Sequence, residues 1–181
     1  MALASRQGVQ IRAEAVFILS ELPHQGRHTP AQLRQLHERL AKARSSQILM
    51  LWMTSIFIDL CVEAGDLELA QTVLDPLLAI RDTMHRADFL RLEGVLQLQR
   101  AAPDAVAAER SFENAIEVAR EQGAKSFELR AATSLATLWH GQGKRNEARE
   151  LLGGVYGWFT EGFQTPDLQR AKSLLDEIGP A

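Results

Sequence analysis

Two groups of residues have types and spacings that could do chemistry, and each lacks a part that the chemistry requires. Gly157 and Gly162 have the spacing of a phosphate-binding loop, but the sequence continues with "FQT" where the lysine that binds the terminal phosphate must stand. His24, His28 and His37 could ligate a metal, yet no carboxylate or thiol is spaced to complete a site. We therefore expect neither a cofactor nor a metal.

Nucleophilic catalysis is not indicated either. The single cysteine, Cys61, lies in the most apolar run of the chain, "ILMLWMTSIFIDLCV" from Ile48 to Val62, which favours an inert core thiol. Serine, histidine and aspartate are present without the strand–turn–helix signature that surrounds a hydrolase nucleophile. The expectation is a protein that is not an enzyme, and a small enzyme without a sequence signature is the alternative.

The bulk composition narrows the class of protein. The 181 residues are enough for one domain, which we predict over residues 1–181. The chain carries 20 basic and 23 acidic side chains without a basic stripe, which argues against nucleic-acid binding. One cysteine permits no internal disulfide and is compatible with a cytoplasmic location. The apolar run is shorter than the roughly 20 residues of a spanning helix and contains Asp59, so it predicts a buried helix rather than a membrane anchor.

Helices are predicted throughout the chain, since apolar residues recur at helical spacing and strand patterns are nearly absent. Thr29 and Thr165 are predicted N-caps, and Pro76 is expected to kink or break the helix that contains it. Short connections make successive helices antiparallel neighbours. The predicted ranges are 7–22, 30–44, 46–64, 67–81, 84–100, 104–122, 125–141, 144–160 and 166–178.

One motif, an alanine followed by apolar residues four and seven positions later, recurs in the second helix of successive hairpins. It begins at Ala70, Ala108 and Ala148, at intervals of 38 residues (70 to 108) and 40 residues (108 to 148). Gly94 and Ala136 stand at a small-residue position of the preceding helices, where a small side chain lets the second helix approach. This pattern resembles the tetratricopeptide repeat.

The resemblance implies an all-α fold of antiparallel helical hairpins, stacked as a tetratricopeptide-like right-handed solenoid. About four hairpins are expected, followed by a capping helix over residues 165–181 whose outer side is polar. The chain departs from the family pattern where Asp82 and Thr160 replace the prolines at repeat ends, and the first hairpin is degenerate.

A second resemblance covers residues 46–178. The segments "FLRLEGVLQL", "AERSFENAIEVAREQGAKSFELRAATSLATLWHGQGKRNEARELL" and "VYGWFTEGFQTPDLQRAKSLLDE" are similar to the C-terminal repeat region of large bacterial regulatory ATPases. Those proteins join a cyclase or DNA-binding domain to an NTPase module and a repeat array. The resemblance implies a scaffold or signal-transmitting arm, whose partner is a protein, a peptide or another domain of the parent chain. It does not imply NTPase or cyclase activity.

The tetratricopeptide resemblance also implies a concave groove lined by the first helix of each hairpin. An aromatic side chain, arginines and small polar groups in this groove suit a peptide or a small ligand. Protein binding, small-molecule sensing in the groove, and merely solvated side chains are the three interpretations that stay open. The groove positions carried over from the family are Trp52, Ser55, Asp59, Asp88, Arg91, Val95, Arg130, Thr133, Thr137 and His140.

The helix predicted over 46–64 is apolar on every side, which is more than a repeat helix needs. We therefore expect the exposed side of this helix to be covered by the first hairpin, by a second copy of the chain or by a partner. Trp52 and Met53 are predicted to lie at or beside this contact. A homodimer is therefore one expected assembly.

The glycine-rich stretch near the C-terminus is interpreted as structural. The apolar face of the last hairpin helix is expected to continue from Val155 to Trp158 and Phe159, and Gly162 is expected to end the helix. The glycines at 153, 154 and 157 are expected to permit the close approach of a neighbouring helix.

Overall fold

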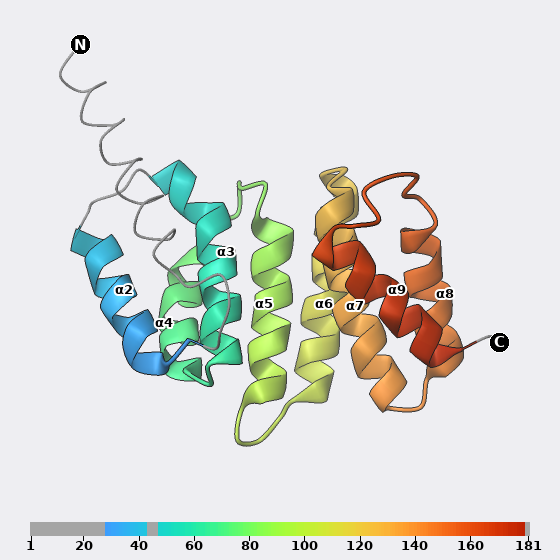
Figure 1. Ribbon diagram of the computed structural model, residues 1–181, viewed down its shortest axis with the longest axis horizontal. Coiled ribbons are helices and arrows are strands. Elements are labelled where there is room, and N and C mark those ends of the chain that lie inside the picture. The colour runs from blue at the N-terminus through green and yellow to red at the C-terminus, as the bar shows by residue number, and fades with distance from the viewer. Residues whose placement is uncertain (1–27, 43–46, 180–181) are drawn as a thin grey trace, which may run out of the picture. The chain divides into compact units, whose positions relative to one another are not determined.

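The computed structural model describes residues 28–42 and 47–179, with side chains described for 28–38 and 54–179. Every regular element in these ranges is a helix, which confirms the all-α prediction for the described part of the chain (Figure 1). The helix predicted over 7–22 lies outside the described residues. None of the described helices has both the length and the apolar content needed to cross a bilayer. The helices are α2 (Pro30–Lys42), α3 (Gln47–Glu63), α4 (Leu67–Leu78), α5 (Arg86–Gln99), α6 (Ala105–Glu121), α7 (Lys125–Gly141), α8 (Arg145–Tyr156) and α9 (Pro166–Ile178).

The chain divides into two compact units, residues 1–73 and 74–181, and the single domain expected over its whole length stays a prediction. In the first unit, Thr29 and Gln32 cap the start of α2 reciprocally. The Gln32 N–H donates to Thr29 Oγ1 at 3.4 Å, and the Thr29 N–H donates to Gln32 Oε1 at 2.9 Å. From α2, Arg34 donates two hydrogen bonds of 2.7 Å to Asp66, whose Oδ1 accepts the N–H of Leu69 in the first turn of α4.

The inner face of α3 contains Phe57, Ile58 and Cys61, all of which are buried. Burial raises the pKa of the Cys61 thiol to about 12, so this side chain stays a neutral thiol at physiological pH. The interpretation of Cys61 as a core residue is confirmed.

Two helices end three or more residues earlier than the sequence predicts. α4 runs through Pro76 and ends two residues later at Leu78, so the proline does not break it. α8 ends at Tyr156 rather than at residue 160, and the low helix propensity of the glycines at 153, 154 and 157 is the physical reason. Trp158 therefore lies in the following loop with 59% of its surface exposed, and it does not continue the apolar face of the helix. Gly162, at φ 77°, lies in a turn of that loop and does not end α8.

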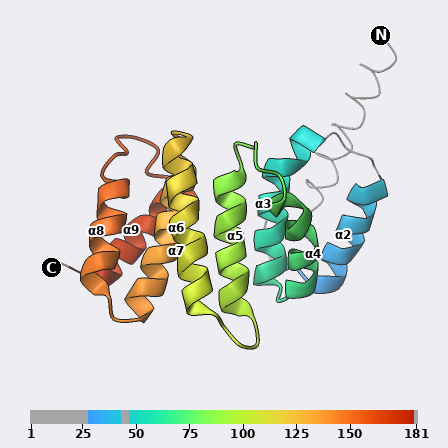
Figure 2. The same cartoon turned by 180° about the vertical axis from the view of Figure 1, so that it is seen from behind.

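The second unit is a stack in which each helix packs against the next along the chain, from α5 to α9. In addition, α7 packs against both α5 and α9. Figure 1 shows these helices from the front, and Figure 2 shows them from behind. The repeated motif supplies the centre of the core, which confirms the burial that its register predicts. Its buried members on α6 and α8 are Ala108, Phe112, Ala115, Ala148, Leu152 and Val155.

Glycine permits close packing at one predicted position and not at the others. A Cβ atom on Gly94 would lie 2.5 Å from Cε1 of Phe112, so α5 and α6 can approach this closely only because Gly94 has no side chain. The prediction for the glycines of α8 is wrong. A Cβ atom on Gly153 or Gly154 would meet nothing within 4 Å, and one on Gly157 would meet only the backbone of Gly153, at 3.2 Å.

The last helix, α9, starts at Pro166 as the sequence predicts, with Thr165 at the N-cap position. Asp167 lies in its first turn. The Thr165 hydroxyl does not cap the helix, because it donates to the carbonyl oxygen of Gly162 at 2.8 Å. The apolar face of α9 joins the core of the second unit through its buried residues Leu168, Ala171, Leu174 and Ile178.

Candidate functional site

A chain of charged side chains connects α5, α7 and α9 in the second unit. Asp88 on α5 is at its centre, and only 1% of that residue is exposed. Asp88 Oδ1 accepts a hydrogen bond from Arg91 Nε at 2.7 Å, and Oδ2 accepts one from Arg130 Nη1 on α7 at 2.9 Å. On the other side of Arg130, its Nε lies 3.9 Å from Asp167 Oδ1 on α9. These four side chains, the ion-pair cluster, bring two positive charges to two negative ones.

The cluster is positioned by helical spacing and maintained by burial. Asp88 and Arg91 are three residues apart on α5, which places them on the same face of the helix. The side chain of Arg91 is only 6% exposed, so its charge is stabilised by the carboxylate rather than by water. Removing one partner of such a pair leaves the other charge buried and uncompensated, which is strongly destabilising. The cluster therefore constrains how α5 and α7 pack against each other.

The polar face of α7 continues beyond Arg130. Thr133 and Thr137 each donate their hydroxyl to the backbone carbonyl four residues earlier, at 2.7 and 2.8 Å. Thr133 is buried, whereas Thr137 is exposed. His140 Nε2 lies 3.5 Å from Glu177 Oε1 on α9, and its buried Nδ1 has no hydrogen-bond partner among the described residues. Thr137 is thus exposed on this face, between Arg130 and His140, which are half-buried and contact α9.

The predicted groove positions on α5 and α7 come together in the second unit, and those on α3 belong to the first. Ser55 is buried, and its hydroxyl has no hydrogen-bond partner in the described part of the chain. Asp59 is half-buried. The side chains of Trp52 and Met53 lie outside the described residues, so the interface proposed for them stays a prediction.

The sequence interpretation missed the contribution of α9. The sequence predicts α9 only as a cap, yet Asp167 and Glu177 on this helix each lie within 4.0 Å of a groove residue on α7. Asp167 and Glu177 are ten positions apart, which corresponds to nearly three helical turns, so the sequence could place them on one broad face of the helix. Which helix this face meets is decided only by packing.

The arrangement favours a positioning role for the charged residues. Among the described residues, no group of three or more His, Cys, Asp or Glu side chains could hold a metal ion. Arg91 and Arg130, which the sequence suggests for peptide recognition, are instead bound to a carboxylate of the same unit. Comparison with models of known families, with curated proteins and with solved structures finds no match for this chain.

Proposed function

We propose that the chain is a non-enzymatic repeat scaffold that binds a protein or peptide partner, or transmits a signal to other domains of a larger bacterial regulatory ATPase or cyclase. The proposal includes a tetratricopeptide-like right-handed solenoid and a cytoplasmic location. The observation that supports it most is the packing of α7, which contacts α5 and α9 as well as its neighbours in sequence. A repeat array produces this pattern, because the first helices of successive hairpins then form one continuous surface.

The ion-pair cluster gives that surface a defined shape. Arg130 is 20% exposed and is oriented by Asp88 on one side and Asp167 on the other. Side chains that are already ordered lose little conformational entropy when a partner binds. The preordered Arg130 therefore lowers the entropy cost of binding a partner at this surface. The role that follows for Asp88 is to position Arg130, not to contact the partner.

Site-specific photo-crosslinking tests the proposal. A photoreactive amino acid at Thr137, exposed on α7, is compared with the same amino acid at Glu113, exposed on α6. We expect a discrete crosslinked protein band from position 137 in the native host, and none of that mass from position 113. Equal crosslinking from both positions, or from neither, would contradict a specific protein-binding face on α7.

Two further measurements separate the other expectations. A reproducible rise in melting temperature with a metabolite, lost when Thr137 is replaced by a bulky residue, would favour small-molecule sensing on this face. Light scattering of the wild-type chain and of the Trp52→Glu, Met53→Glu double variant tests the homodimer. Loss of self-association with an unchanged helical circular dichroism signal supports an interface at these residues, and unfolding assigns them to the core.

A further inference from the structure

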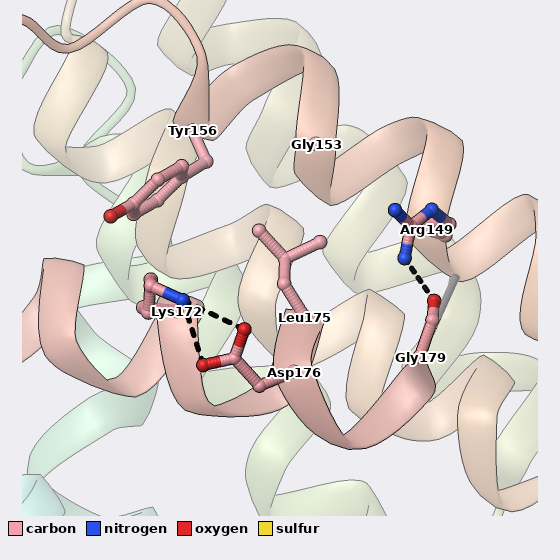
Figure 3. Close-up of a pocket in the computed structure, with 7 residues that line it drawn as sticks. All are labelled: Arg149, Gly153, Tyr156, Lys172, Leu175, Asp176 and Gly179. Atoms are coloured by element: carbon pink, nitrogen blue, oxygen red, sulfur yellow. Dashed lines mark hydrogen bonds and ion pairs between the residues drawn. The ribbon is translucent and has the colours of Figure 1, made fainter. Parts of the chain in front are cut away.

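A hollow between α8 and α9, away from the ion-pair cluster, has the size of a small-molecule site. Its volume is about 510 Å³, and its lining comes from both helices (Figure 3). Pockets that bind small organic ligands have volumes of about 300–1,000 Å³ and combine an apolar wall with a few polar groups. Leu175 points from α9 into the space, opposite Gly153 on α8 (Figure 3).

The α8 wall is open because a side chain is missing there. A Cβ atom on Gly153 would meet nothing within 4 Å, so no neighbouring atom requires glycine at this position. Glycine inside a helix is less favourable than alanine by about 1 kcal/mol. At Gly94 the ring of Phe112 explains why glycine is needed, whereas at Gly153 no group of the described residues does. The bare backbone leaves room for a flat group to lie between the two helices.

One end of the hollow presents a cation, Arg149, that pairs with no carboxylate of the described part of the chain. Arg149 Nη1 donates to the backbone carbonyl of Gly179, which orients the half-buried guanidinium across the space between the helices (Figure 3). A guanidinium has five N–H donors in a planar fork, and it binds carboxylates by two parallel hydrogen bonds. Among the described residues, Arg149 forms no ion pair, in contrast to Arg91 and Arg130 in the same unit.

The opposite end is polar and electrically balanced. Lys172 Nζ donates to both carboxylate oxygens of Asp176, at 2.7 and 2.8 Å. The Tyr156 side chain lines the same end from the α8 side (Figure 3). With two cations and one carboxylate, the hollow has a net charge of one positive unit. Tyr156 lies seven positions after Arg149, which corresponds to about 10 Å along the helix.

We propose that this hollow binds a small monocarboxylate with a flat apolar body and a hydroxyl group at its far end. The carboxylate pairs with Arg149, the body lies between Gly153 and Leu175, and the hydroxyl bonds to Tyr156 or to the Lys172–Asp176 pair. This site is separate from the α7 face, so its failure leaves the proposed scaffold function intact. A ligand here would contact both α8 and α9, and it would stabilise their packing.

Titration with 3-(4-hydroxyphenyl)propanoate tests the site, since this acid has the required charge, flat body, length and hydroxyl. We expect saturable binding with a dissociation constant of about 1 mM or lower, typical of a ligand of this size. Its neutral amide should bind about tenfold more weakly, because a hydrogen-bonded charge pair is lost. Absence of saturation by the acid at concentrations about tenfold above the expected constant overturns the proposal.

Three variants locate the binding. Arg149→Gln should weaken binding of the acid about tenfold and remove the difference between acid and amide, whereas Arg145→Gln, exposed on the same helix, should leave both unchanged. Gly153→Leu fills the hollow and improves helix propensity, so it should abolish binding without lowering the melting temperature. Binding that survives Gly153→Leu, or that falls equally in both arginine variants, refutes the assignment.

Discussion

The replacement of Gly94 by alanine tests the closest helix contact of the second unit. The new Cβ atom would lie 2.5 Å from Cε1, 2.8 Å from Cδ1 and 3.0 Å from Cζ of Phe112. Non-bonded carbon atoms prefer separations of about 3.5–4.0 Å, so the ring or the backbone must move by about 1 Å. Phe112 is only 1% exposed and is packed on all sides, so the ring has no free space to enter. Overpacking of this kind costs about 1–3 kcal/mol.

Alanine also stabilises any helix in which it replaces glycine, and a second variant removes this effect from the comparison. At Gly154, on α8, a Cβ atom would meet nothing within 4 Å, so Gly154→Ala should raise the free energy of unfolding by about 0.5–1 kcal/mol. Because both variants gain similar helix propensity, the difference between them measures the clash. We expect Gly94→Ala to be the less stable of the two by about 1–3 kcal/mol.

The assay is urea unfolding followed by circular dichroism, with thermal melting as a second readout, in which 1 kcal/mol corresponds to about 2–4 °C for a chain of this size. Combining Gly94→Ala with Phe112→Leu gives a double-mutant cycle that tests whether the two positions are in contact. In that background the cost of Gly94→Ala should shrink, because the smaller side chain vacates part of the space that Cβ enters. Equal stability of Gly94→Ala and Gly154→Ala, or an unchanged cost in the Phe112→Leu background, would refute the contact.

Two other predictions concern the same core. Ala148 is completely buried, so Ala148→Arg should lower the free energy of unfolding by about 3 kcal/mol or more, and a melting temperature within a degree or two of wild type would show that the repeat register is wrong. The hydrogen bond from Trp139 Nε1, at 2.6 Å, is the main cause that lowers the pKa of Glu109, with Lys144 adding to it against the effect of burial. This interaction therefore stabilises the fold above the ordinary glutamate pKa, and the stabilisation is lost as the pH falls through the lowered value. Trp139→Phe should reduce the stability at neutral pH by about 1 kcal/mol and should flatten its loss on acidification, and parallel pH profiles of the two proteins would contradict this assignment.

Local sequence patterns account for the helices and for most of the buried face of the second unit. Helical spacing is a local property, since apolar residues three and four apart share a face whatever surrounds them. The alanine motif starting at Ala108 and Ala148 therefore predicts the core residues, and Gly94 predicts a close approach. The same reasoning is wrong at the end of α8, where the glycines weaken the helix and Trp158 is left in an exposed loop.

Which helix faces meet and which charges pair depends on how the helices pack in three dimensions. The spacing of Asp88, Arg91 and Arg130 is compatible with an open binding groove, and packing instead places two of them in the interior with the third held between α5 and α9. The hollow beside Gly153 has no sequence signature, because a helical glycine reads alike whether it faces a neighbouring helix or an empty space. Long-range contacts depend on how far apart elements come to lie, and that distance is set by the sum of all packing interactions rather than by any local pattern.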